Sequence, residues 1–176
     1  MPPACIGVNI PTATEVTPSA DRLAFDEFYI AHVHRIYRAL AVTLGNDDLA
    51  RESVDEAMTR AYAHWRRVRG LDYPAGWVFR VGLNWATSWR RKVGREQGVL
   101  TEERQPRTAA TDPAALAARE ALARLPLAQR AVIVCRVLLD LSTVETADAL
   151  GLSEGTVKSR LSRGLTALRR ALEGEE

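Results

Sequence analysis

The stretch "GLSEGTVKSRLSRGLTALRRAL", Gly151 to Leu172, begins with a glycine turn and continues with the spacing of one helix. On a helical wheel of about 100° per residue, five apolar side chains share a face about 80° wide, namely Val157, Leu161, Leu165, Leu168 and Leu172. The opposite face carries hydroxyl and basic side chains, namely Thr156, Ser159, Arg163, Thr166 and Arg170. This pattern predicts an amphipathic helix with one polar side. For this stretch taken alone, a surface helix with a merely solvated polar face is the alternative.

The preceding residues turn that helix into half of a motif. The segment "TVETADALGLS" predicts a short helix with a small Ala147 where a second helix crosses it, then a turn at Gly151 and a cap at Ser153. This is the helix-turn-helix pattern, whose second helix enters the DNA major groove with its N-terminal residues toward the bases. The candidates for contact with DNA are Glu154, Gly155, Thr156, Lys158, Ser159 and Arg160.

The rest of the chain also predicts helices. Asp21 can cap the first, Gly45 ends it, Asn46 starts the second, and Pro74 opens a third that runs to about Lys92. The helical period is lost in residues 96–115, which predict a flexible linker, and residues 1–20 are Pro/Thr-rich and predict a disordered tail. The fold class is therefore all-α, with two small helical domains, 21–95 and 116–173, joined by the linker.

Acidic and basic side chains gather on different helices. The second predicted helix aligns Asp48, Glu52 and Asp55 at helical spacing, with Glu56 beside them. Such a stripe is ordinarily a solvated face, but because it repels DNA, any partner that binds it is a protein. Residues 65–95 hold eight Lys/Arg and one Asp, an electrostatic pattern typical of nucleic-acid binding.

The third predicted helix has one polar stripe on an otherwise apolar surface: Arg80, Asn84, Thr87 and Arg91, joined by Ser88. The loop before it, "RRVRGLDYP", adds Tyr73, and stacking of bases on an aromatic ring suits single-stranded DNA. We expect Trp77, Trp85 and Trp89 on the same helix to belong to the core.

Composition excludes several classes of protein. Two cysteines, Cys5 and Cys135, do not make a disulfide scaffold, and a reducing cytoplasm is the simplest setting. No apolar run approaches the ~18 residues of a membrane span, and the N-terminus lacks the pattern of a signal peptide. No metal-ligand spacing, phosphate loop or nucleophile motif occurs, so we expect no cofactor, no metal and no enzymatic activity.

At this point three motifs in order resemble a known family. "GNDDLARESVDEAMTRAYAHW", "PAGWVFRVGLNWATSWRRK" and "LPLAQRAVIVCRVLLDLSTVETADALGLSEGTVKSRLSRGLTALRRAL" are similar to regions 2 and 4 of extracytoplasmic-function (ECF) sigma factors. The likeness covers about residues 24–92 and 116–172. The chain departs from the family pattern at two places. Asp55 replaces the family's usual Gln, and "TVETADAL" lacks a bulky residue early in its helix.

The resemblance implies a role for each surface. Domain 21–95 would be a three- to four-helix region 2, in which Asp48, Glu52, Asp55 and Glu56 dock on a coiled coil of core RNA polymerase. The −10 promoter element would meet Arg66, Arg67, Arg69, Tyr73, Arg80, Asn84, Thr87, Ser88, Arg91 and Lys92. The −35 element would meet the helix-turn-helix of region 4 through Ser153, Glu154, Gly155, Thr156, Lys158, Ser159, Arg160 and Arg163.

The resemblance also implies partners and a setting. The partners would be core RNA polymerase and promoter DNA in the bacterial cytosol, and the family commonly has an anti-sigma factor as well. The linker would thread toward the polymerase active-site channel. A stand-alone helix-turn-helix regulator is the alternative, and it would require residues 24–92 to form a ligand or dimerisation domain. The basic stretch in those residues disfavours a small-molecule pocket.

Overall fold

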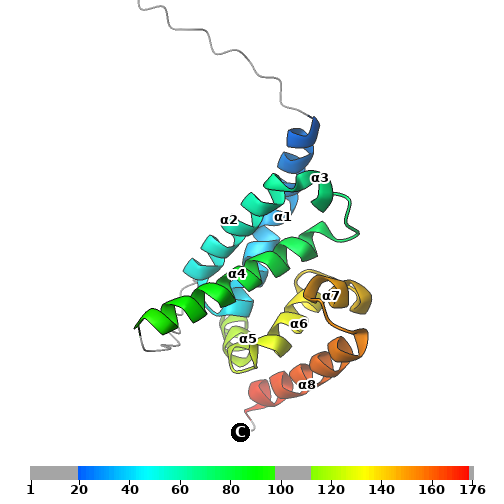
Figure 1. Cartoon of the computed structure of the whole chain (residues 1–176). Coiled ribbons are helices and arrows are strands. Elements are labelled where there is room, and N and C mark those ends of the chain that lie inside the picture. Colours follow the sequence, from blue (N-terminus) through cyan, green and yellow to red (C-terminus); the bar gives the residue numbers. More distant parts are fainter. Residues whose placement is uncertain (1–19, 98–111, 175–176) are drawn as a thin grey trace, which may run out of the picture.

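The computed structural model describes residues 20–97 and 112–174, and within those ranges every regular element is a helix. The first group comprises α1 (Ala20–Leu44), α2 (Asp47–Ala63), α3 (Trp65–Val68) and α4 (Pro74–Gln97). The second comprises α5 (Pro113–Ala123), α6 (Leu127–Val137), α7 (Thr143–Leu150) and α8 (Glu154–Glu173) (Figure 1). The all-α prediction is confirmed, whereas the predicted tail and most of the predicted linker lie outside the described residues.

Several helix ends follow directly from local sequence. The Asn46 side chain accepts a hydrogen bond from the Leu49 backbone N–H at 2.8 Å, which caps α2 as predicted. Gly45 adopts φ 66°, a left-handed conformation that ends α1 at little steric cost. Pro74 opens α4, where its missing N–H is no loss.

Three boundaries differ from the predictions. α1 begins at Ala20, so Asp21 lies inside the first turn instead of capping the helix. α4 continues past Lys92 to Gln97. A four-residue helix, α3, follows α2 where only a break was predicted.

The first group is an antiparallel bundle of α1, α2 and α4. Ile36, Leu40, Val78 and Phe79 are completely buried between these helices. α4 approaches closely at Gly82, where an added Cβ would stand 2.9 Å from Leu40 Cδ1. This packing leaves one long side of α2 and one long side of α4 free of the bundle.

The second group builds the predicted helix-turn-helix. Ser142 and Glu145 form a reciprocal capping box at the start of α7. Gly151 adopts φ 65° and ends α7 as predicted, and Ser153 accepts from the Thr156 backbone N–H at 3.2 Å to cap α8. Val157 is completely buried against Val132 and Ala147, which fixes the angle between the two helices.

The apolar face predicted for α8 is only partly covered. An added Cβ at Gly164 would stand 2.8 Å from Ile133 Cδ1, so α6 packs tightly over this glycine. Leu165 and Leu172, which lie to one side of that line of contact, remain 42% and 52% exposed.

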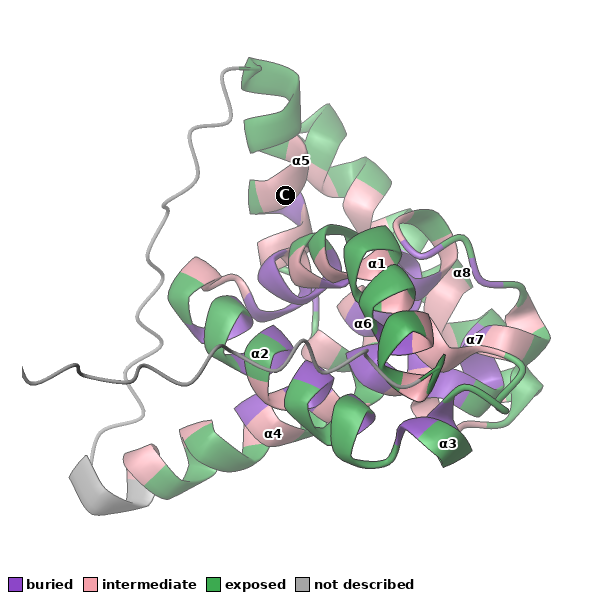
Figure 2. Cartoon of the chain, turned by 90° about the horizontal axis from the view of Figure 1, so that it is seen from above, coloured by how far each residue is buried: buried purple, intermediate pink, exposed green. Residues whose placement is uncertain are grey.

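The two groups pack against each other through α1, α4, α6 and α7. Val134, Cys135 and Leu139 belong to the same buried cluster as the core of the first group. In Figure 2 the buried residues of α1, α2 and α6 lie toward the middle of the molecule. The division into two separate domains remains a prediction, because in this structure both groups share one core.

Candidate nucleic-acid interface

The acidic stripe of α2 lies on the surface. Asp48, Glu52 and Asp55 are exposed, and Glu56 is half-buried and accepts from Arg60 Nε at 2.7 Å. They share one side because Leu49, Val54, Ala57 and Met58 occupy the other side of α2 within the core. A partner that carries basic side chains can therefore meet three exposed carboxylates on this side of α2, while Glu56 is already paired with Arg60.

The arginines after α2 are held by α3. Trp65 is buried edge-on against Phe25, with ring centroids 5.3 Å apart, and Val68 is also buried. This anchoring directs Arg66, Arg67 and Arg69 outward, and all three are exposed. Together they give the short helix one apolar side and one strongly basic side.

Asp21 forms ion pairs with two of these arginines, which the sequence did not predict. Its carboxylate accepts from Arg66 Nε at 2.8 Å and pairs with Arg69 at 2.9 Å. The hydrogen bond from Arg66, followed by the charge of Arg69, lowers the pKa of Asp21. Because 45 residues separate Asp21 from Arg66, no local pattern could have revealed this pairing.

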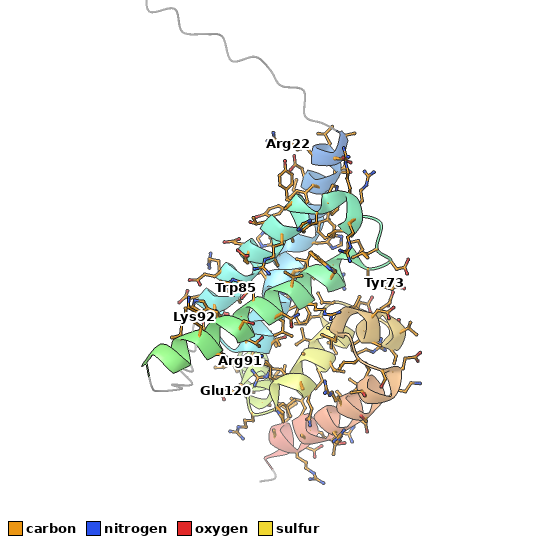
Figure 3. The ribbon with its side chains drawn as sticks, in the orientation of Figure 1. Arg22, Tyr73, Trp85, Arg91, Lys92 and Glu120 are labelled. Carbon is orange, nitrogen blue, oxygen red and sulfur yellow. The ribbon has the colours of Figure 1, made fainter. Side chains whose placement is uncertain are left out.

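Tyr73 stands at the end of the basic loop, beside α7 (Figure 3). A hydrogen bond from its hydroxyl to the Glu145 carboxylate raises the pKa of Tyr73. Glu145 also accepts from the Ser142 backbone N–H, and these bonds lower the pKa of Glu145, with the Ser142 bond the larger cause. The predicted base-stacking residue of the first group is thus tied to the first turn of the helix-turn-helix.

The polar stripe of α4 forms as predicted. Val78, Phe79 and Ala86 are buried on one side of the helix, so Arg80, Asn84, Ser88 and Arg91 are exposed on the other, with Thr87 half-buried. Lys92 is exposed beyond them. The half of the stripe nearest Tyr73 faces α7 and α8.

The tryptophans of α4 divide between two environments. Trp77 and Trp85 are partly buried against the core, as predicted. Trp89 is 42% exposed and stacks on Trp85 at 6.4 Å between centroids, so its assignment to the core is wrong. Trp89 lies on the apolar side of the helix, near the end of α4 where the neighbouring helices no longer cover it.

Most of the predicted reading residues of α8 are accessible. Six are exposed, namely Ser153, Glu154, Gly155, Lys158, Ser159 and Arg163, while Thr156 and Arg160 are half-buried. Arg163 donates to the Ser159 carbonyl at 3.2 Å, and Lys158 lies 3.7 Å from Glu154. Such exposed local contacts are weak enough to exchange for contacts with bases or phosphates.

Arg160 has a different position from its neighbours. It lines a cavity of about 290 Å³ together with Asn84 and Thr87 of α4. This cavity is lined by residues of both groups of helices. The predicted −10 and −35 surfaces therefore meet at this one place.

The described residues offer little chemistry of other kinds. Burial raises the pKa of the Cys135 thiol to about 12, which leaves it unreactive at neutral pH. Within residues 20–97 and 112–174, no three His, Cys, Asp or Glu side chains gather as metal ligands. None of the helices described there is both long and apolar enough to cross a bilayer.

Comparison with known proteins identifies the family. The model of sigma-70 region 4 matches residues 115–168, which contain the helix-turn-helix. ECF RNA polymerase sigma factor SigM of Mycobacterium tuberculosis (Erdman) is 31% identical over 157 residues, covering 88% of this chain and 80% of SigM. RNA polymerase sigma-E factor of Streptomyces coelicolor is 33% identical over 168 residues, covering 88% of this chain and 94% of that protein.

Two solved structures share the fold. Sigma factor RpoE of Bartonella quintana, in complex with the anti-sigma factor NepR, aligns with a TM-score of 0.77 at 24% identity over 87% of this chain and 99% of RpoE. CnrH in complex with the cytosolic domain of CnrY aligns with a TM-score of 0.64 at 24% identity, over 90% of this chain and 93% of CnrH. With its helix-turn-helix, its separate acidic and basic faces and these relatives, the chain belongs to the ECF group of RNA polymerase sigma factors.

Proposed function

We propose that this chain binds core RNA polymerase in the cytoplasm and directs it to specific promoters. The separation of charge carries the proposal, because the acidic face of α2 repels DNA while the basic faces of α3, α4 and α8 attract it. One molecule with both faces suits an adaptor between a protein and DNA. Polymerase performs the chemistry, and the chain supplies recognition without a cofactor.

Each surface has an assigned partner in this proposal. The stripe of Asp48, Glu52, Asp55 and Glu56 docks on the coiled coil of the large polymerase subunit. Arg66, Arg67, Arg69 and Tyr73 receive the melted strand of the −10 element, which continues along the α4 stripe to Lys92. Lys158, Ser159 and Arg163 reach the −35 element from the exposed side of α8. An anti-sigma factor is a further proposed partner, since relatives of the same fold are found bound to one.

In vitro transcription tests the function directly. Core polymerase, this chain and fragmented genomic DNA of the same organism are incubated, and the 5′ ends of the transcripts are sequenced. The proposal predicts start sites that share two short sequence elements at fixed spacing and that vanish without the chain. Transcripts that are identical with and without the chain would refute it. The stand-alone regulator predicts no new start sites.

A further inference from the structure

Asp21 bridges two arginines of the predicted −10 surface. Its Oδ2 atom accepts a hydrogen bond from Arg66 Nε at 2.8 Å, and its Oδ1 atom lies 2.9 Å from Arg69 Nη1. Each carboxylate oxygen therefore serves a different guanidinium. A phosphodiester also presents two charged oxygens, and arginine binds both kinds of anion in the same way. The carboxylate of Asp21 thus occupies a place that suits a phosphate group of a nucleic acid.

The packing of α1 against α3 brings these three residues together. Phe25 lies one turn after Asp21 on α1, and its ring meets the buried Trp65 edge-on at 5.3 Å between centroids. Arg66 and Arg69 are three residues apart at the end of α3, so both side chains start from the same side of this short helix. The Arg69 N–H donates to the Trp65 carbonyl at 2.9 Å, which holds Arg69 in the helical turn. The backbone and the core therefore set where the two arginine side chains begin.

Positive charge predominates around this bridge. A cavity of about 420 Å³ lies beside it, lined by the start of α1, the end of α2 and α3. Three arginines line the cavity, and Asp21 is the one acidic residue among those that line it. They are Arg22, Arg66 and Arg67, of which Arg22 lies at the start of α1 (Figure 3). Together with Arg69, four arginines surround a single carboxylate, so the local field favours a further anion.

The bridge is open to solvent, which makes it exchangeable. The side chains of Asp21, Arg66 and Arg69 are 31%, 87% and 50% exposed. Water screens ion pairs at such positions, so they contribute little to the stability of the fold. The carboxylate is ionised at neutral pH, because the hydrogen bond from Arg66 and then the charge of Arg69 lower its pKa. An incoming anion can therefore replace it without unfolding α1 or α3.

Resting on the proposed function, we propose that Arg66 and Arg69 form a phosphate subsite for the single strand, and that Asp21 is its internal counter-ion, which a strand phosphate displaces. In the free chain the carboxylate occupies the subsite and weakens the attraction of this surface for any strand. When bases of the −10 element bind nearby, a phosphate of the same strand is held beside the subsite and replaces the carboxylate. A phosphate contact carries no sequence information, so Asp21 sets how tightly the surface binds and not which sequence it prefers.

Asp21→Asn tests the displacement without polymerase. Asparagine keeps the shape of the side chain and removes the competing charge. We expect the full-length variant to bind a short fluorescent single-stranded oligonucleotide of mixed sequence at least threefold more tightly than the unmodified chain does, as measured by fluorescence anisotropy at low salt. Affinities that do not differ, including binding too weak to detect in both proteins, would overturn the proposal.

Asp26→Asn is the matched control, because Asp26 is exposed on the same helix and takes no part in the bridge. It raises the net charge by the same amount, and we expect no gain in affinity. In a chain that carries Arg66→Gln and Arg69→Gln, Asp21→Asn should also have no effect, because no guanidinium remains for which it competes. A threefold gain in either case would reveal a general effect of charge and overturn the assignment.

Free phosphate is another source of the same kind of anion. Inorganic phosphate should displace the oligonucleotide no better than chloride at equal ionic strength, because a free ion lacks the neighbouring contacts of a strand. Stronger displacement by phosphate would assign the subsite to free anions and overturn the proposal.

Measurements with core polymerase separate the subsite from the proposed function. Asp21→Asn should raise the affinity of the holoenzyme for a promoter and for the same promoter with a scrambled −10 element by similar factors. A gain for only one of the two would contradict a phosphate contact. If Asp21→Asn binds the oligonucleotide more tightly but transcription with core polymerase yields no new start sites, the phosphate subsite remains and the proposed function fails.

Discussion

Arg130→Met should destabilise the whole chain strongly, because Arg130 joins three separate carbonyls. Its guanidinium donates to Thr43 at the end of α1 at 2.8 Å, to Ala123 at 2.8 Å and to Leu125 at 2.9 Å. A hydrogen bond from a charged donor contributes about 1.5–3 kcal/mol when one partner is removed. Methionine keeps the apolar stem, and water can reach some of the carbonyls, so we expect a loss of about 3 kcal/mol.

Urea unfolding followed by circular dichroism measures this loss. At a slope of about 2 kcal/mol per molar urea, the midpoint should fall by about 1.5 M. The melting temperature should fall by about 6–12 °C for a chain of this size. The control is Arg124→Met. Arg124 is exposed in the connection between α5 and α6, so its replacement should lower the free energy of unfolding by less than about 0.5 kcal/mol. If Arg130→Met were as stable as that control, the bonds across α1 and α6 would not support the fold.

Replacing Asp48, Glu52 and Asp55 together by Lys should abolish binding to core polymerase and leave the helix content unchanged. A pull-down with core polymerase checks this, and unchanged affinity would contradict the docking assignment. If Arg163 contacts a base, Arg163→Ala should weaken binding of the holoenzyme to promoter DNA by about 1–3 kcal/mol. If Arg163 contacts a phosphate, the substitution should lower the slope of log affinity against log salt concentration by about one. No effect on either the affinity or the slope would remove Arg163 from the interface. Glu145→Gln should reduce the fall in the free energy of unfolding as the pH is lowered. Since folding lowers the pKa of Glu145, its contribution is present above the unfolded pKa and is lost as the pH falls through the folded pKa. Urea midpoints from pH 7 to pH 3 check this, and parallel curves for both proteins would contradict it.

The local features of the fold could be predicted from sequence because each depends on neighbouring residues. Asn46, Pro74 and Ser153 mark helix starts by their own backbone chemistry, and Gly151 marks a helix end. The acidic and basic faces also follow from helical spacing alone, although the partners assigned to them stay predictions.

The contacts between distant residues could not be predicted in this way. A helical wheel shows which side of α4 or α8 is apolar, but not which neighbour covers it, so the exposure of Trp89 and Leu165 was missed. The pairing of Asp21 with Arg66 depends on how α1 lies beside α3. The close packing of α4 against α7 depends on Gly76 meeting Ala149, and neither residue shows any sign of this in its own segment.

Promoter binding with and without core polymerase distinguishes a sigma factor from a stand-alone regulator. A fluorescent promoter fragment, chosen from the start sites found by transcription, is titrated with the chain alone, with core polymerase alone and with both together at one salt concentration. We expect tight, sequence-specific binding only when both are present, at least a hundredfold tighter than with the chain alone. Equally tight specific binding by the chain alone would contradict a role as a sigma factor and identify a stand-alone regulator.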